Sequence, residues 1–363
     1  MENRSIGFRP SPQQKCILSR GQKDSSHRAA CVVRIEGKLD SNRLREACKA
    51  VVRRHEILRT TFQCPPGVRV PYQVVETEAG AVAQFSLSAG DAGLNFLSVA
   101  VPSLCADAAT LRNLVREIFD LYSGHVQNEE TPLQYADFSE WQNELLEGED
   151  PALQAAKDYW SELGFSSLTV PVLPLEMRGV RSVSSEPETV EAQIGAGLAA
   201  DVTRSAREQK SSVSDFLLAC WLSLLWRLGE QADIPVLEVV DGRNRAELKR
   251  AMGVFARPLP IRISFGEEPA FAEVLRRVRE ATSEAAPYSD HLTPEEFFPP
   301  GSEAAALPVG FEFAERMPKL LGDGLSFSVE RLSAPLYPFK VKLACEWGED
   351  AGTVRFEYHP QLW

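Results

Sequence analysis

The clearest pattern along the chain is a stripe of apolar residues with helical spacing from Leu44 to Val52. Its members recur at i, i+3, i+4, i+7 and i+8, the face that a helix buries against a sheet. They are Leu44, Ala47, Cys48, Val51 and Val52. Asp40 and Ser41 come shortly before the stripe and predict the N-cap of this helix. A similar stripe over residues 107–122 predicts a second helix.

Alternating and β-branched segments predict strands between these helices. The expected strands are 31–37, 94–101, 189–194, 235–240, 258–264, 307–313, 325–331, 338–346 and 352–358. Further helices are expected at 135–146, 152–163, 199–209, 213–228 and 269–286. Each half of the chain mixes sheet and helix, so we predict an α/β protein built of α+β two-layer lobes.

The length of the chain and one change in composition predict two lobes. A chain of 363 residues is too long for one small core. Residues 166–187 are rich in proline and serine and have no sustained period, which is typical of a linker. We therefore expect an N-terminal lobe at 1–165, a linker at 166–187 and a C-terminal lobe at 188–363.

Composition and charge exclude several classes of protein. The chain is 44% hydrophobic and 25% charged, as expected of a globular protein. Its formal net charge of −12 argues against a broad nucleic-acid surface, because phosphates would meet too few cations. We find neither a signal-peptide pattern nor an apolar run that could span a membrane. The seven cysteines lack C-x-x-C spacing and the five histidines lack metal-site spacing, which favours a reducing cytoplasm and no metal.

Several segments together resemble one known family. Residues 54–62 (RHEILRTTF) resemble the RHExLRTxF signature of the condensation domains of nonribosomal peptide synthetases. Residues 11–14 (SPQQ) and 135–141 (YADFSEW) resemble the S-x-x-Q and YxDFxxW segments of that family. In the second half, residues 242–243 and 252–262 resemble its GR and (I/V)GxFxNxLPxR segments. The order and spacing of these segments make the resemblance specific over most of the chain.

The resemblance implies a fold and a set of partners. Condensation domains have two lobes like chloramphenicol acetyltransferase, arranged as a V with a tunnel between them. Peptidyl or acyl carrier protein domains bring substrates there as thioesters on 4′-phosphopantetheine arms, and the domain itself binds no cofactor directly. An adjacent adenylation domain or a recruited tailoring enzyme is a further expected partner, whereas nucleic acid and membranes are not expected.

The active-site motif of this family, HHxxxDG, is altered at residues 102–108, which read PSLCADA. Ser103 occupies the position of the second histidine, which in the family orients or deprotonates the attacking amine. A hydroxyl can donate and accept hydrogen bonds, but without a partner it is no base near neutral pH. Asp107 is retained, and the resemblance pairs it with Arg59 in a structural role that shapes the active-site loop.

Other positions also depart from the family pattern. Residues 257–258 (Arg-Pro) stand where the family has Asn-Thr, and the segment before Pro102 is shorter than usual. The chain ends at Trp363, before the closing helices of the family, so we expect a truncated C-terminal lobe. We regard Pro102, Cys105 and Arg257 as candidates for the tunnel or its loop.

Three features with chemical potential have simpler structural explanations. His55 and Glu56 belong to the RHExLRTxF signature, where they brace the end of a helix. Cys105 has no His or Lys close in sequence that could lower its pKa, so we expect a small buried residue. Lys340 and Lys342 alternate on an expected strand, which predicts a solvated face.

Three functions stay open on the sequence alone. A domain that joins or loads carrier-bound substrates would rely on proximity, with Ser103 or backbone N–H groups positioning the amine. A binding module would keep the fold and serve as a docking platform for a carrier protein or a tailoring enzyme. A stand-alone acyltransferase with a soluble acceptor is the third. The loss of both histidines, together with the other departures, favours the docking platform over amide-bond formation.

Overall fold

The computed structural model describes residues 7–19, 27–68, 70–125, 131–164, 170–177, 180, 187–229, 231–266, 269–298 and 307–363. The chain forms two compact units, each of which is described by itself. Unit 1 comprises Met1–Gly148, Arg243–Ala256 and Met317–Leu336. Unit 2 comprises Glu149–Gly242, Arg257–Arg316 and Tyr337–Trp363.

A five-stranded antiparallel sheet forms the centre of unit 1. In spatial order its strands are β11 (Leu320–Gly322), β12 (Leu325–Ser333), β2 (Arg28–Gly37), β6 (Asn95–Pro102) and β5 (Gln84–Ala89). Burial alternates along β2, as its sequence predicts, with Ala29, Cys31, Val33 and Ile35 inside. β5 is the last strand in this order, so one of its edges is unpaired within the described part of the chain.

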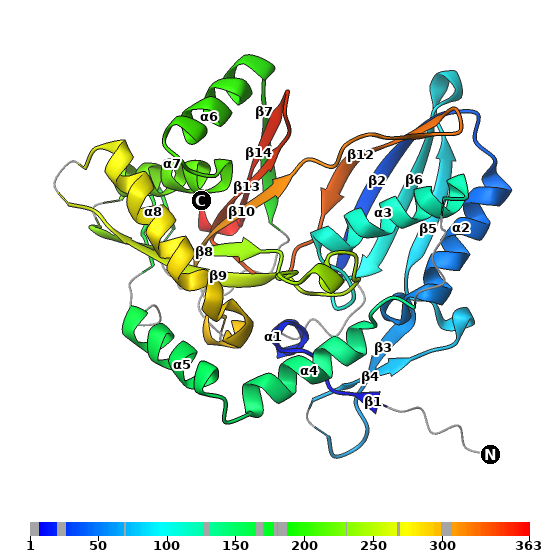
Figure 1. The fold of residues 1–363 in the computed structure, drawn as a ribbon, viewed down its shortest axis with the longest axis horizontal. Helices are drawn as coiled ribbons and strands as arrows, with labels where there is room; N and C mark the ends of the chain where they lie inside the picture. The colour runs from blue at the N-terminus through cyan, green and yellow to red at the C-terminus, as the bar shows by residue number, and fades with distance from the viewer. Residues whose placement is uncertain are drawn as a thin grey trace. The chain divides into compact units, whose positions relative to one another are not determined.

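A small second sheet and the first four helices complete unit 1. The sheet contains β1 (Gly7–Phe8), β4 (Tyr72–Val75) and β3 (Thr60–Gln63). The helices are α1 (Pro12–Ser19), α2 (Ser41–Arg54), α3 (Ala108–Ser123) and α4 (Tyr135–Glu147). Helix α3 contacts both α2 and β2, so the two predicted apolar stripes pack together beside the large sheet (Figure 1).

Helix α2 forms where the apolar stripe predicts it. The carboxylate of Asp40 caps its start by accepting hydrogen bonds from the backbone N–H groups of Asn42, at 2.9 Å, and Arg43, at 3.1 Å. The five residues of the predicted stripe are the buried residues of the helix. Helix α2 ends at Arg54, where His55 leaves the helical conformation.

A six-stranded mixed sheet forms the centre of unit 2. Its strand order is β7 (Glu188–Ile194), β14 (Gly352–Tyr358), β13 (Val341–Trp347), β10 (Val309–Glu315), β8 (Asp233–Val240) and β9 (Arg257–Ser264). Its helices are α5 (Pro151–Leu163), α6 (Ala196–Glu208), α7 (Val213–Leu228) and α8 (Phe271–Ala285). Apolar residues of α7 and α8 join those of the strands in one core, as the amphipathic pattern of α8 predicts. Figure 1 shows the two helices beside this sheet.

The two units interleave in sequence, a feature the sequence analysis did not anticipate. Helix α5 lies in unit 2, although we expected residues 1–165 to form one lobe. Segments 243–256 and 317–336 lie in unit 1, although we expected 188–363 to form the other lobe. Of the expected linker at 166–187, only residues 170–177, 180 and 187 are among the described residues.

The expected solvated face at Lys340 and Lys342 is wrong, because both side chains are buried in unit 2. The ammonium group of Lys340, 1% exposed, lies 2.8 Å from the carboxylate of Glu176. The ammonium group of Lys342 lies between Glu312 on β10, at 2.6 Å, and Glu357 on β14, at 3.0 Å. Strand β13 is an interior strand, so carboxylates on its two neighbours neutralise a cation that looks exposed in sequence.

Candidate functional site

The candidate site in unit 1 is the turn that joins the end of β6 to the start of α3. Strand β6 ends at Pro102, whose carbonyl accepts a hydrogen bond from the N–H of Cys105 at 2.8 Å. The N–H of Ser103 donates to the carbonyl of His27 at 3.0 Å, which continues the β2–β6 pairing by one residue. This tight turn brings Asp107 to the N-cap position of α3.

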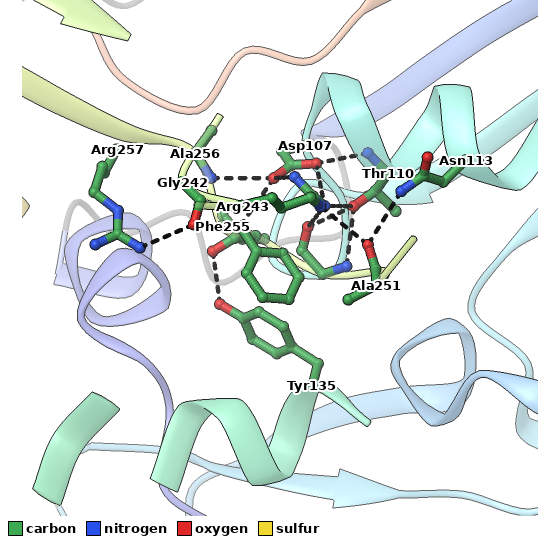
Figure 2. Close-up of polar contacts among 12 residues, drawn as sticks. Asp107, Thr110, Asn113, Tyr135, Gly242, Arg243, Ala251, Phe255, Ala256 and Arg257 are labelled. Carbon is green, nitrogen blue, oxygen red and sulfur yellow. Dashed lines mark hydrogen bonds and ion pairs between the residues drawn. The ribbon is translucent and has the colours of Figure 1, made fainter. Parts of the chain in front are cut away.

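Asp107 is fully buried and is the most densely bonded residue of the turn (Figure 2). One carboxylate oxygen accepts from the N–H of Thr110 at 2.7 Å and so caps α3. The other oxygen accepts from the N–H groups of Phe255, at 2.8 Å, and Ala256, at 3.1 Å. The guanidinium group of Arg243 donates to both oxygens at 3.0 Å, a bidentate ion pair.

The side chain of Arg243 is also buried, with 1% of its surface exposed. Its guanidinium group also donates to the carbonyl of Ala251 at 3.1 Å and to the hydroxyl of Thr110 at 2.8 Å. It lies over the ring of Phe255, 4.3 Å from the ring centroid, in a cation–π contact. The pair therefore joins α3 to the segment 243–256, which is far away in sequence.

The charges of this pair determine the protonation of Asp107. Burial alone would raise the pKa of this carboxyl group. The positive charge of Arg243 and the hydrogen bonds from Arg243 and Thr110 outweigh the burial and lower the pKa below its ordinary value. Asp107 is therefore a fixed anion that holds backbone and side-chain donors in place, not a proton donor near neutral pH.

The expected pairing of Asp107 with Arg59 is wrong. The guanidinium group of Arg59 donates to the carbonyl of Glu76 at 2.5 Å and lies 3.5 Å from the carboxylate of Glu56. Arg243, which belongs to the GR segment, takes the place expected for Arg59. Both motifs were identified in the sequence. Arg243 lies 136 positions from Asp107, however, and no local sequence pattern indicates which arginine pairs with this aspartate.

Ser103 lies at the start of the turn with its side chain enclosed. It is 2% exposed, and its Oγ has no hydrogen-bond partner among the residues that the structure describes. An activated serine nucleophile needs a base within hydrogen-bond reach. In this conformation no base among the described residues lies within hydrogen-bond reach of the Ser103 hydroxyl.

His27 is a residue near the site that the sequence analysis missed. The β2–β6 register pairs Arg28 with Pro102, so the next pair along the two chains is His27 and Ser103. Directly opposed residues of an antiparallel pair are cross-strand neighbours. The two positions are 76 residues apart in sequence, so only the strand register could have indicated their proximity.

Cys105 lies in the interior of unit 1. It is fully buried, and its thiol lies 3.6 Å from the carbonyl of Thr60, to which it donates. Burial raises the pKa of this thiol to about 12. The thiolate that nucleophilic catalysis requires is therefore scarce near neutral pH.

His55 braces the end of α2, as expected from the RHExLRTxF resemblance. Its Nε2 lies 2.7 Å from the carboxylate of Glu117 on α3, and Arg54 donates to the same carboxylate at 2.8 Å. Burial alone would raise the pKa of Glu117, but His55 and Arg54 together lower it. The histidine thus joins two helices and occupies a structural position.

Arg257 is buried at the start of β9 in unit 2. Its guanidinium group donates to the carboxylate of Asp290 at 2.7 Å and to the carbonyl of Ser289 at 2.9 Å. A longer contact of 3.5 Å reaches the carbonyl of Gly242 (Figure 2). The arginine that departs from the family pattern is therefore held by an ion pair within its own unit.

Tyr135 and Gly253 fix the segment 243–256 in unit 1. The hydroxyl of Tyr135 donates to the carbonyl of Val254 at 2.7 Å and lies 2.7 Å from the hydroxyl of Ser11. Gly253 has φ +147, and a Cβ atom there would lie 1.9 Å from the Tyr135 ring. Only glycine fits at this position, which explains why the chain keeps the GxF part of the motif.

Two further findings concern the described residues as a whole. Within the described ranges, His, Cys, Asp and Glu side chains form no group of three or more that could hold a metal ion. None of the helices in those ranges has both the length and the apolar character that crossing a bilayer requires.

The fold and the recognised motifs define a class of protein. The mixed helix and sheet architecture is that of solved condensation-domain structures, which confirms the predicted fold class. The family model described as "Condensation domain" matches residues 95–291, which is more than half of the chain. The chain therefore belongs to the condensation domain family, and the resemblance inferred from the motifs is confirmed.

Curated relatives are large peptide synthetases. The chain is 29% identical over 304 residues to a plipastatin synthase of Bacillus subtilis (strain 168), covering 77% of this chain and 8% of the relative. It is 30% identical over 289 residues to gramicidin S synthase 2 of Brevibacillus brevis, covering 72% of this chain and 6% of the relative. The chain thus spans less than a tenth of the length of these relatives.

Solved structures with the same fold include condensation domains and X-domains. The condensation domain of the Monacolin K polyketide synthase MokA aligns with a TM-score of 0.84 at 20% identity, covering 99% of this chain and 94% of that one. The X-domain from teicoplanin biosynthesis aligns with a TM-score of 0.79 at 22% identity, covering 100% and 91%. A complex of that X-domain with OxyB aligns with a TM-score of 0.75 at 23% identity, covering 100% and 90%.

Proposed function

We propose that this chain is a condensation-family domain of a nonribosomal peptide synthetase system that binds a protein partner and no longer forms amide bonds. The observation that carries the proposal is Ser103. It replaces the family's catalytic histidine, and its Oγ is enclosed without a hydrogen-bond partner among the described residues. A hydroxyl in this state neither deprotonates an amine nor attacks a thioester.

The intact scaffold around Ser103 supports a retained role for the fold. Asp107 and Arg243 are fully buried and bonded to each other, to α3 and to the segment 243–256. Removing one member of such a pair would leave an uncompensated buried charge. Retention of both charges is what we expect of a domain whose shape still matters after its histidines are lost.

The solved complex of an X-domain with OxyB supports the choice of partner. That X-domain shares the fold of this chain. We propose two kinds of partner for this chain: a carrier protein whose 4′-phosphopantetheine arm holds an acyl or aminoacyl group, and a tailoring enzyme that acts on the carrier-bound group. Both partners would come from the same biosynthetic pathway as this chain, and the domain itself would hold no cofactor.

Direct binding tests this proposal. Carrier proteins and tailoring enzymes encoded beside this chain would be titrated against it by isothermal titration calorimetry. We expect saturable binding of at least one of them, with a Kd in the micromolar range or tighter. Failure of every neighbouring carrier and enzyme to bind would overturn the proposal.

Activity measurements separate the docking role from catalysis. With donor and acceptor carriers both loaded, we expect no product above the rate without the domain. Ser103→Ala and Ser103→His should bind the partner as tightly as the parent chain does, because the hydroxyl takes no part in docking. Product formation by the parent chain that Ser103→Ala abolishes would instead establish an enzyme.

One observation favours that second function, an amide-forming or acyl-transferring enzyme that lacks the usual histidine pair. His27 is the cross-strand neighbour of Ser103, so an imidazole is present at the adjacent position of the site. If the chain does form product, His27→Gln should lower kcat at least tenfold, because an amide cannot accept a proton from the attacking amine. An unchanged kcat in His27→Gln would exclude the histidine from the reaction.

A further inference from the structure

Unit 1 has a cavity that the candidate site does not use. Its volume is about 510 Å³, within the roughly 300–1,000 Å³ of small-molecule sites. It lies between helix α2 and strand β5, which are adjacent in unit 1 (Figure 1). None of the residues of the turn 102–108 lines it.

Apolar side chains form two facing walls of the cavity. One wall is the stripe side of α2, with Leu44, Cys48 and Val52. The opposite wall comes from the sheet, where Phe85 and Leu87 of β5 lie beside Leu97 of β6. Leu87 is 39% exposed, so part of this apolar surface contacts water when the cavity is empty. Covering it with a methylene chain would remove that contact and be favourable.

The rim of the cavity is cationic. Arg45 and Lys49 lie one turn apart on α2, and both line the cavity. Lys49 is 2.8 Å from Glu46, but this pair is exposed and so holds the ammonium group weakly. Arg45 donates to the neutral amide oxygen of Asn42 at 2.8 Å. Glu46 does not line the cavity, so the charged side chains that do are both cations.

The dimensions of the cavity favour a slender occupant. The lining residues of α2 run from Ser41 to Val52, a length of about 16 Å at 1.5 Å per residue. A cavity of about 510 Å³ beside this length of helix has the size of a small-molecule site. We therefore infer a small ligand with an extended alkyl chain as its occupant.

We propose that the cavity between α2 and β5 binds an alkyl carboxylate. Its methylene chain lies between the apolar walls, and its carboxylate faces Arg45 and Lys49. The site is separate from Ser103, so it adds to the proposed docking function and does not depend on it. Binding is tested with the intact chain and with no carrier protein present.

Isothermal titration calorimetry with octanoate, 1-octanol and butyrate tests both halves of the proposal. Octanoate should bind with one site per chain and a Kd in the low millimolar range or tighter. Octanol keeps the chain but lacks the charge, so it should bind at least tenfold more weakly. Butyrate keeps the charge but lacks the chain, so it should not bind measurably.

Two variants block the cavity by different means. Cys48→Phe fills the space beside α2, and Leu87→Glu places a carboxylate on the exposed sheet wall. Both should abolish octanoate binding, and Leu87→Glu should retain the parent Tm because its position is already partly exposed. If Cys48→Phe does not fold, Leu87→Glu still decides the outcome.

A matched pair of variants tests the cationic rim. Arg45→Gln combined with Lys49→Gln should weaken octanoate at least tenfold and leave octanol unchanged. Arg53→Gln removes one cation of the same helix that does not line the cavity, and it should have no effect. The proposal is overturned if octanoate does not bind, if octanol binds as tightly as octanoate, or if Leu87→Glu binds octanoate like the parent chain.

Discussion

Asp107 connects two parts of the chain that are far apart in sequence through a single carboxylate. It caps α3, pairs with Arg243 and accepts two backbone N–H groups of the segment 243–256. The resemblance identified both motifs but assigned the aspartate to Arg59. The error has a physical cause, because a motif specifies which residues are present and the tertiary fold decides which charges meet.

The pair makes a strong prediction for stability. Arg243→Met leaves a buried carboxylate without its cation, so the free energy of unfolding should fall by about 3–5 kcal/mol. Urea denaturation followed by circular dichroism measures this loss. Arg250→Met is the control, because Arg250 is 80% exposed and lies 4.0 Å from Asp120, and it should cost less than about 1 kcal/mol. Equal losses in the two variants would contradict the assigned role.

Glu238 on β8 predicts a pH dependence of the stability of unit 2. Burial raises the pKa of this carboxyl group to about 7, and the Asp215 carboxylate nearby adds to the effect. The native state therefore holds a proton that the unfolded state releases near pH 4.3, so stability from this group falls as pH rises from about 4.3 to 7.

Replacing the carboxyl group by an amide removes this loss. Glu238→Gln should raise Tm by about 2 °C or more at pH 8 and have little effect at pH 4. Differential scanning calorimetry at several pH values provides the measurement. The exposed Glu349 serves for comparison, and Glu349→Gln should leave the pH profile unchanged. A gain from Glu238→Gln that is equal at both pH values would exclude the proposed titration.

At the scale of elements, the hydrophobic period predicted the long helices and interior strands well. The apolar stripe of α2 is buried as predicted. Asp40, which the sequence predicted as part of the N-cap, lies directly before the first residue of the helix. Helix α1 was missed because its buried side chains include Gln13 and Gln14, which show no apolar period. Strand β5 was missed because its residues are mostly exposed at the edge of a sheet.

The tight contact at Gly253 predicts that this position tolerates no side chain. Gly253→Ala places a Cβ atom 1.9 Å from the Tyr135 ring at a φ of +147, so steric overlap and backbone strain both oppose folding. We expect a loss of at least about 2 kcal/mol in the free energy of unfolding. Gly197 on α6 has nothing within 4 Å of a built Cβ atom, so Gly197→Ala should be neutral or stabilising. A neutral Gly253→Ala would show that the segment can move away from Tyr135.

At the scale of the whole molecule, the chain does not divide into consecutive lobes. Unit 1 takes residues 243–256 and 317–336 from the second half of the sequence. Strand β12 from this second half pairs with β2 near the start of the chain. Composition indicated a boundary near the linker, but a strand that pairs across such a distance leaves no signal in local composition.

This interleaving predicts the behaviour of a fragment. Residues 1–148 alone lack β12, and Asp107 in this fragment lacks Arg243. We expect the fragment to show no cooperative thermal transition by circular dichroism, whereas the full chain melts cooperatively. A cooperative transition of the fragment at the Tm of the full chain would show that the later segments are dispensable for unit 1.

The separation of Asp107 from Arg243 also has a consequence for synthesis on the ribosome. The two residues are 136 positions apart, so at 5–20 residues per second Arg243 is made about 7–27 s after Asp107. Through that interval the nascent α3 carries an anion whose permanent counter-ion does not yet exist. Formation of this ion pair therefore waits for translation to reach Arg243, and a pause between the two codons would prolong the time during which Asp107 lacks its partner.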